Sequence, residues 1–314
     1  MRLAWPLDLP VLAACLLLPL GACALDDSAD AGPAGEADDP SDGSGSDDPD
    51  DPAATPAAFA SCTALPYAPG APQGFEHLGN EVVAAGGGPT HHAQDIVVRA
   101  DQAATVSGVF QYSILAVDIA DEVVRVSLDT CDGWRDLGSV RTDDDGRAAV
   151  AIAEPLAPGV YHLVFEVTAD ATLASAYLWS LPAGTRMALF DIDGTLTSSN
   201  SELWKEILLG DYVPEPTPSA ANLTAAHAER GHIPIFLGAR PGTLDAITRA
   251  WLDDLEFAHG VVHLTEHAAQ MVPTNSGVGV YKRDFIRSLL DAGLLIDVAY
   301  GDASTDIFAY LAVG

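Results

Sequence analysis

Basic residues are scarce in this sequence, which holds 14 Lys and Arg against 45 Asp and Glu in 314 residues and has a formal net charge of −31. The imbalance is not confined to one end, because residues 59–314 alone contain 33 acidic and 13 basic residues. An acidic surface repels nucleic acid and is not drawn to anionic lipid headgroups. We therefore expect no nucleic-acid partner, and lipid binding through a basic patch is disfavoured.

Long apolar runs are missing beyond the first 25 residues, so no transmembrane helix is predicted there. The N-terminal run, Leu9 to Leu20, leads into Gly21-Ala22-Cys23, as in a signal peptide that ends in small residues. This ending resembles the bacterial lipobox. The resemblance implies a signal peptide over 1–22, a lipid on Cys23, and export to the periplasmic face or cell surface with an anchor in a bacterial membrane. An ordinary secretory signal cut nearby is the alternative, and it too places the protein outside the cytoplasm.

The segment that follows lacks core-forming residues. Residues 26–58 contain no aromatic residue and no aliphatic residue larger than Ala. Such a segment cannot bury enough apolar surface to offset the entropy lost on ordering. We expect 23–58 to be an acidic, disordered tether.

Cysteine is rare, with four in the chain. Cys15 lies in the signal and Cys23 would carry the lipid, so Cys62 and Cys131 remain for the folded part. A pair of cysteines in an oxidising compartment predicts a disulfide. Two free thiols are the alternative, because sequence does not give the Cα separation.

Residues 59–184 are rich in short β-prone runs separated by turns. The runs of Val, Ile, Tyr and Phe lie at 95–99, 104–112, 123–128, 148–152, 161–168 and 175–181. This spacing predicts an antiparallel β-sandwich of about six or seven strands. Asp143 to Asp145 favour a hairpin turn over a calcium loop, since EF-hand spacing is missing. His91 and His92 would face opposite ways on an extended segment, which favours local hydrogen bonding over metal binding.

Predicted β-strands and α-helices alternate along residues 185–314. Core strands are predicted at 187–190, 233–237, 261–264 and 295–300, and helices at 202–209, 222–230, 243–255 and 282–292. This order predicts an α/β domain with a doubly wound parallel sheet, whose ligand site lies at the carboxyl ends of the strands.

The first of these strands ends in Asp191-Ile192-Asp193-Gly194-Thr195. Two carboxylates at i and i+2 after a buried strand face one site, and the glycine permits a tight turn beside a phosphate. The run resembles the first motif of the haloacid-dehalogenase (HAD) phosphotransferases. The resemblance implies that Asp191 is the nucleophile, that Asp193 is the acid/base, and that Asp191 and the Asp193 carbonyl bind Mg²⁺. An acidic turn after a core strand is the alternative.

Further candidates follow the later strands. Gly238 and Arg240 come after the second, Lys282 lies near a helix start after the third, and Asp302 and Asp306 follow the fourth. Singly, each is typical of a surface charge or a helix N-terminal acid. Their order resembles the later HAD motifs. It implies that Lys282 bridges the nucleophile and the phosphoryl group, that Asp302 and Asp306 bind Mg²⁺, and that Thr195, Gly238 and Arg240 contact substrate.

A narrower resemblance covers about residues 75–314. The segments that carry it are 91–98, 138–143, 158–161, 181–185, 236–241, 251–252, 259–262 and 300–310. They resemble the lipin-like domain of membrane-associated phosphatidylinositol transfer proteins and the segment that precedes it. Lipins are Mg²⁺-dependent phosphatidate phosphatases, whereas the domain in the transfer proteins has lost catalytic aspartates and is thought to bind phosphatidate. Asp191, Asp193 and Asp302 resemble the active branch.

Two features depart from that family. Gly238 stands where a Ser or Thr normally hydrogen-bonds the phosphoryl group, and losing one such donor costs about 10²-fold to 10³-fold in rate. The chain also stops at Gly314, where the family continues into another strand and helix. We expect the sequence to be truncated there.

The sequence thus predicts a β-sandwich followed by a lipin-like HAD domain that hydrolyses a phosphomonoester, with phosphatidate or a related phospholipid as the expected substrate. A phosphatidate-binding module without catalysis is the main alternative, favoured by Gly238 and opposed by the aspartates. A surface lipoprotein with a relic site is the third.

Overall fold

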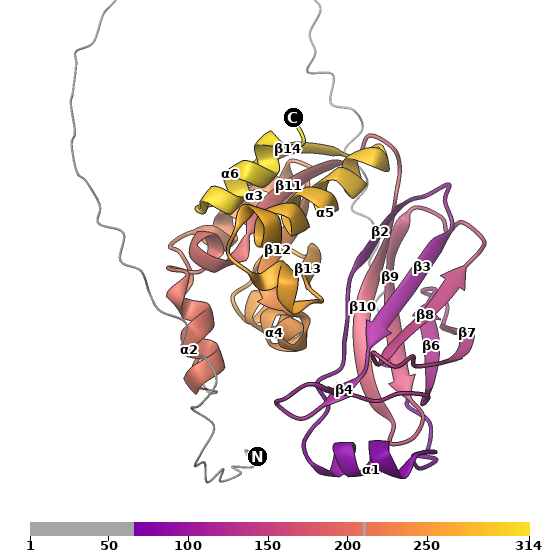
Figure 1. Ribbon diagram of the computed structural model, residues 1–314. Coiled ribbons are helices and arrows are strands. Elements are labelled where there is room, and N and C mark those ends of the chain that lie inside the picture. The colour runs from indigo at the N-terminus through magenta and orange to yellow at the C-terminus, as the bar shows by residue number, and fades with distance from the viewer. Residues whose placement is uncertain (1–65, 210–211) are drawn as a thin grey trace, which may run out of the picture. The chain divides into compact units, whose positions relative to one another are not determined.

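A computed structural model describes residues 66–209 and 212–314, which belong to one compact unit within 52–314 (Figure 1). The predicted signal peptide, the lipidation site Cys23, the tether and Cys62 lie outside the described residues. Cys131 is disulfide-bonded. Since the other cysteines are not described, its pairing with Cys62 stays a prediction. Within the described part of the chain, no helix has the length and apolar character needed to cross a membrane.

The first part is a β-sandwich, preceded by helix α1 (Leu78–Ala85). Its larger sheet has the order β2-β10-β9-β6-β7, made of β2 (Ile96–Arg99), β10 (Thr172–Leu181), β9 (Gly159–Val167), β6 (Val123–Asp129) and β7 (Trp134–Arg141). The smaller sheet has the order β1-β3-β8, made of β1 (His92–Ala93), β3 (Ala104–Val109) and β8 (Arg147–Ile152). A short ribbon pairs β4 (Gln111–Tyr112) with β5 (Val117–Asp118).

The six predicted strands are present, with two corrections. Strand β7 was not predicted, because it contains Asp136 and Gly138, residue types that strands disfavour. Gly138 has a φ of 106° and lies opposite a register shift at Val126, so a bulge accommodates it. The sandwich is also not wholly antiparallel, since β2 pairs parallel to β10. A hairpin would force two consecutive strands to run antiparallel. The strand after β2 in the chain, β3, lies in the other sheet, so no hairpin fixes the direction of β2 relative to β10.

Alternate residues of these strands form the core of the sandwich. In β6 the fully buried side chains are Val124, Val126 and Leu128, and in β9 they include Leu163 and Phe165. A period of two along each strand directs one face inward, so the hydrophobic pattern fixes the register.

The second part is a four-stranded parallel sheet with the order β13-β12-β11-β14. The strands are β11 (Arg186–Asp191), β12 (Ile233–Pro241), β13 (Val261–Thr265) and β14 (Leu295–Tyr300). The α-helices are α2 (Ser201–Leu209), α3 (Ala220–Glu229), α4 (Asp245–Asp254), α5 (Val280–Asp291) and α6 (Ser304–Leu311). Short helical turns η1 (Ile192–Leu196), η2 (Gly242–Leu244), η3 (Ala268–Met271) and η4 (Asn275–Gly279) connect them. The predicted alternation of strands and helices is confirmed.

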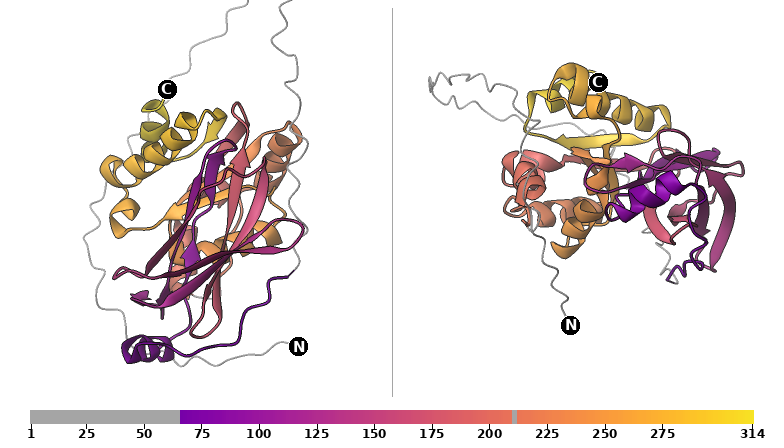
Figure 2. Two further views of the ribbon diagram at one scale, coloured as in Figure 1. Left: turned by 90° about the vertical axis from the view of Figure 1, so that its right-hand side faces the viewer. Right: turned by 60° about the horizontal axis from the view of Figure 1, so that its bottom comes forward.

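Strand β11 is buried on both faces. Met187 and Leu189 belong to a hydrophobic cluster with residues of α5, whereas Ala188 and Phe190 belong to one with residues of α3 and α4. Figure 2 shows α5 and α6 on one side of the sheet and α3 and α4 on the other. Because β12 and β14 flank β11, the chain reverses its direction of winding there, and doubly wound sheets bind their ligands at the carboxyl ends of the strands beside such a reversal.

The edge of this sheet is joined to the sandwich by two side chains. Gln94 Oε1 accepts the backbone N–H of Leu264 at 3.0 Å, and Asp95 Oδ2 accepts that of Val262 at 2.9 Å. Asp95 also pairs with Arg249 of α4 at 2.8 Å and accepts the N–H of Tyr177. Strand β13 is the last strand of its sheet, so these backbone N–H groups have no partner strand on that side. The buried side chains of Gln94 and Asp95 accept hydrogen bonds from them, which leaves neither group unpaired.

The sequence favoured local hydrogen bonding for His91, but its partners within the sandwich are distant in sequence. Its Nδ1 accepts the N–H of Gln111 at 3.0 Å, its Nε2 lies 2.9 Å from Thr172 Oγ1, and its ring packs on Tyr112. Burial lowers the pKa of His91 to about 4.

This histidine should make stability depend on pH. The unfolded chain binds the proton below about pH 6.5 and the folded chain only below about 4, so the free energy of unfolding falls as the pH falls between these values. We expect His91→Gln to reduce the loss of stability between pH 7 and 4.5 by about 2 kcal/mol. Urea unfolding at both pH values measures this, and equal losses in the two proteins would contradict it.

Candidate active site

The site is built on the turn that follows β11. Asp191 is the last residue of the strand, and η1 turns the chain at Gly194, which has a φ of 88°. A Cβ added at Gly194 would lie 2.4 Å from Asp302 Oδ2. Glycine is therefore required both for the turn and for the close approach of Asp302.

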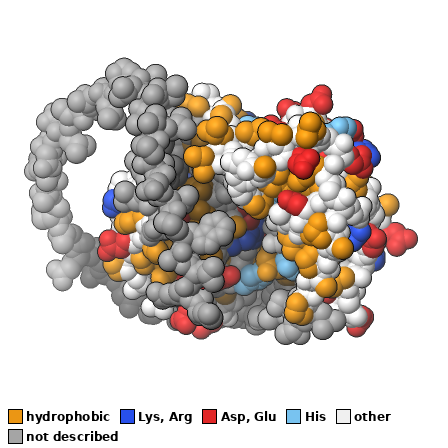
Figure 3. Space-filling view, turned by 90° about the horizontal axis from the view of Figure 1, so that it is seen from below, with side chains coloured by type: hydrophobic (Ala, Val, Ile, Leu, Met, Phe, Trp, Pro, Cys, Tyr) orange, Lys and Arg blue, Asp and Glu red, His pale blue; other side chains and the backbone are white. Residues whose placement is uncertain are grey.

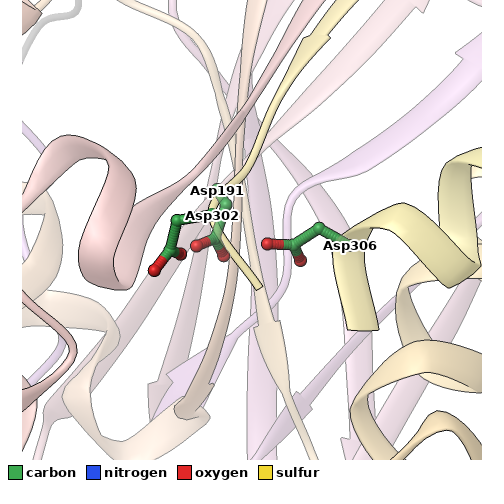
Figure 4. Close-up of side chains that lie close together, drawn as sticks. All are labelled: Asp191, Asp302 and Asp306. Carbon is green, nitrogen blue, oxygen red and sulfur yellow. The ribbon is translucent and has the colours of Figure 1, made fainter. Parts of the chain in front are cut away.

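Three of the predicted aspartates converge at this edge of the sheet. Asp191 comes from β11, Asp302 from the segment after β14, and Asp306 from the first turns of α6 (Figure 4). One carboxylate oxygen from each lies within 4.8 Å of the others. Asp191 and Asp306 are buried, whereas Asp302 is exposed and accepts a hydrogen bond from Asn200 at 2.8 Å. Carboxylate oxygens beside an open side are the ligands that Mg²⁺ prefers, so this set fits that ion.

Lys282, the third residue of α5, lies at the same place. Its buried ammonium donates to Asp191 Oδ1 and, at 2.6 Å, to Asp306 Oδ1. Burial lowers the pKa of Lys282, but the two carboxylates more than offset this and raise it. Burial raises the pKa of Asp191 to about 7, against the opposing effect of Lys282. Two buried carboxylates thus share one ammonium, and a divalent cation would supply the charge that the site needs.

Asp193 is turned away from this cluster toward Arg240. The guanidinium donates to both oxygens of Asp193 at 2.8–3.1 Å, and also to Glu206 at 3.0 Å and Thr248 at 3.3 Å. Arg240 is fully buried. The sequence predicted that Arg240 contacts substrate, but its donors are engaged within the protein, and the geometry favours a role in orienting Asp193. The predicted contact between the Asp193 carbonyl and the metal stays a prediction.

The two remaining residues that were predicted to contact substrate are Thr195, which has a hydroxyl, and Gly238, which has only its backbone. Thr195 Oγ1 is 3.5 Å from Asp191 Oδ2, so its hydroxyl lies beside the Asp191 carboxylate. A Cβ at Gly238 would lie 2.9 Å from Ile192 Cδ1 and 3.4 Å from Leu264 Cδ2. Because both neighbours belong to the hydrophobic core, a Ser or Thr at 238 would crowd that core. Only the backbone of Gly238 remains to contact a phosphate.

Sequence reasoning missed three residues of the site. Glu206 and Thr248 hold Arg240 from α2 and α4, and Asn200 holds Asp302. Glu206 looks like an ordinary helix charge in the sequence. Its burial, which raises its pKa, is the signal that sets it apart, and it exists only in the folded chain.

Comparison with known proteins agrees with this division of the chain. Residues 89–179 match the family model described as PITM 1-3, beta-sandwich domain, and residues 188–314 match PITM 1-3, LNS2 domain. Solved structures match only weakly. The D00-D0 domain of intimin, for example, has a TM-score of 0.22 and 17% identity over 29% of this chain and 45% of its own, which supports no argument.

Several curated relatives with similar sequences are named as membrane-associated phosphatidylinositol transfer proteins. Human membrane-associated phosphatidylinositol transfer protein 2 is 27% identical over 71% of this chain and 16% of its own length. Its mouse counterpart is 30% identical over 55% and 13%, and the Drosophila melanogaster protein retinal degeneration B is 26% identical over 71% and 17%. The chain thus spans less than a quarter of the length of these relatives. Its two parts are similar, in this order, to the β-sandwich domain and the LNS2 domain of PITM 1-3.

Proposed function

We propose that the protein is a HAD-type, Mg²⁺-dependent phosphatase that hydrolyses a phosphomonoester through a phosphorylated Asp191. The observation that carries the proposal is the convergence of Asp191, Asp302, Asp306 and Lys282 at the carboxyl ends of β11 and β14. A structural salt bridge would not require a third, exposed carboxylate facing the same point, whereas a cation site open to substrate does.

Asp191, Asp193 and Lys282 have different roles in the proposed reaction. Asp191 attacks phosphorus, so an Asp191 oxygen–phosphorus bond forms and the bond to the leaving oxygen breaks. For this step Asp193 must first be protonated on Oδ2, while Arg240 Nη2 still holds Oδ1; it then gives that proton to the leaving oxygen and takes one from the water that releases phosphate. Lys282 holds Asp191 in place beside the transferring group. Asp191, Asp302 and Asp306 would hold Mg²⁺, which neutralises charge on the phosphoryl oxygens when bound.

The substrate that we propose is phosphatidate or a related phospholipid. Two observations support a lipid. Several relatives are named as membrane-associated phosphatidylinositol transfer proteins, and the N-terminus resembles a lipoprotein signal that would anchor Cys23 in a bacterial membrane. We therefore also propose that the protein is exported and acts at a membrane surface.

A second candidate is a phosphatidate-binding module without catalysis. Gly238 favours it, because this position lacks the side-chain hydroxyl of the Ser or Thr that a phosphatase of this kind uses, and a Ser or Thr there would require the Ile192 side chain to shift. The names of the relatives favour it as well, since they describe transfer proteins and not hydrolases. Binding to phosphatidate liposomes that persists in Asp191→Asn, without phosphate release by the parent protein, would support this candidate.

Replacing the nucleophile tests the proposal. We expect the purified chain with Mg²⁺ to release phosphate from phosphatidate in mixed micelles, and Asp191→Asn to lower the rate at least about 10³-fold, because the amide cannot attack phosphorus. Chelation should abolish the same activity. Asp291→Asn makes the same charge change at an exposed position of α5 and should leave the rate unchanged. Phosphate release from phosphatidate and from soluble phosphomonoesters at the level of Asp191→Asn would rule out the enzyme.

Replacing Arg240 distinguishes positioning from substrate binding. Arg240→Lys keeps the charge but cannot hold both oxygens of Asp193, so we expect kcat to fall about 10²-fold with little change in KM. Arg283→Lys, at a surface pair with Asp284, serves as the control. Steady-state kinetics decide the matter. A rise in KM with kcat unchanged would instead assign Arg240 to substrate.

A further inference from the structure

Helix α3 ends in a compact turn that brings two histidines together. The N–H of His232 donates to the carbonyl of His227 at 3.1 Å, and that of Gly231 donates to the carbonyl of Ala228 at 2.9 Å. Gly231 has a φ of 84°. These two bonds and the left-handed glycine form a Schellman motif, in which the side chains at the positions of His227 and His232 often make a hydrophobic contact. In this chain the same turn places two imidazole rings against each other.

The two rings face each other through the same kind of atom. His227 Nδ1 lies 3.4 Å from His232 Nδ1. A hydrogen bond from a nitrogen donor usually spans about 2.7–3.2 Å, so one formed between these two rings would be weak. Two nitrogens bound tetrahedrally to one zinc ion, each at about 2.0–2.1 Å from it, are about 3.3–3.4 Å apart. The two Nδ1 atoms therefore have the spacing of two ligands of one metal ion.

The other nitrogen of each ring is held by the protein. His232 Nε2 lies 2.8 Å from Asp297 Oδ2, and His227 Nε2 lies 2.9 Å from the hydroxyl of Tyr300. A carboxylate only accepts, so His232 carries its hydrogen on Nε2 and has a lone pair on Nδ1. The Tyr300 hydroxyl can accept as well as donate, so His227 can do the same. Histidines that bind metal ions are typically held in this way, with the second ring nitrogen donating to an oxygen.

His227 is in the form that binds metal ions at neutral pH. Burial lowers its pKa, with further contributions from His232 and Arg230, and the neutral ring is the ligand. The pair also lies near the surface, because the side chains of His232 and Asp297 are 10% and 24% exposed. Water can therefore complete the coordination of an ion.

We propose that His227 and His232 bind a divalent transition-metal ion such as Zn²⁺ through their Nδ1 atoms, with water as the remaining ligands. Imidazole suits Zn²⁺, Cu²⁺ and Ni²⁺, whereas Mg²⁺ prefers oxygen. Through Asp297 and Tyr300 the ion would tie the end of α3 to β14. The aspartates of the candidate active site take no part, so the proposal does not rest on the proposed phosphatase.

Other groups of the chain compete for added Zn²⁺. His91, His92, His162 and His259 line one cavity, and His side chains lie beside Lys or Arg in a recess on the face seen from below (Figure 3). The carboxylates of the candidate active site can also bind a divalent ion. Single substitutions must therefore assign the binding to one place.

Calorimetric titration of the full chain with Zn²⁺ in excess Mg²⁺ tests the assignment. We expect saturable binding that His227→Gln and His232→Gln each weaken at least about tenfold, because one ligand is lost. Asp297→Asn should weaken it about tenfold to a hundredfold, since the carboxylate that holds His232 is lost. His267→Gln removes an exposed imidazole elsewhere and should bind like the parent.

Thermal unfolding separates the loss of a ligand from the loss of structure. Zn²⁺ should raise the unfolding temperature of the parent and of His267→Gln, because an ion that binds the folded chain stabilises it. It should leave that of His227→Gln and His232→Gln unchanged, and all these proteins should unfold cooperatively in chelator. His232→Gln, at the more exposed position of the pair, decides the matter if His227→Gln does not fold.

Three results would overturn the proposal. The first is the absence of saturable Zn²⁺ binding, and the second is binding as tight in His227→Gln and His232→Gln as in the parent. If Asp302→Asn abolished a binding that both His variants kept, the ion would lie at the aspartates. The third is an equal loss of binding in His267→Gln, which would indicate nonspecific binding to imidazoles.

Discussion

The shared ammonium of Lys282 is the interaction on which the cluster of aspartates at the edge of the parallel sheet depends. Asp191 and Asp306 are buried at the end of an apolar sheet, where two carboxylates would repel each other and lose their hydration. Lys282 hydrogen-bonds to both and so permits their approach. The same arrangement leaves Asp302 exposed on the open side, where a cation and a phosphoryl group could enter.

A second buried cation, Arg240, controls the other half of the site. It ties Asp193 to Glu206 of α2 and Thr248 of α4, so the Asp193 carboxylate is oriented by helices from two different connections of the sheet. Thr248 directly precedes Arg249, which pairs with Asp95 of the sandwich. Helix α4 therefore lies between the joint with the sandwich and the residue that orients Asp193.

The contacts of Gln94 and Asp95 with β13 give the sandwich a structural role beside the parallel sheet. Strand β13 is the edge of the parallel sheet, and Gln94 and Asp95 accept two of its N–H groups. Val160, Trp179 and Leu181 of the sandwich also share a hydrophobic cluster with Leu189 and Ile235. An unpaired edge would be a liability, so the sandwich acts as a structural partner of the sheet.

Much of the fold and part of the site could be predicted from the sequence. Apolar runs followed by polar residues placed Asp191, Lys282 and Asp302 at strand ends or helix starts, because such periodicity is local and topology brings parallel strand ends together. Sequence did not indicate that Arg240 would point at Asp193, that Glu206 would be buried, or that Gln94 and Asp95 would pair with a strand 167 residues or more away. A polar side chain has no local signature of its distant partner. The sequence alone determined which residues lie at the carboxyl ends of the parallel strands. Only tertiary packing decided which partners these residues have, and which groups of β13 Gln94 and Asp95 contact.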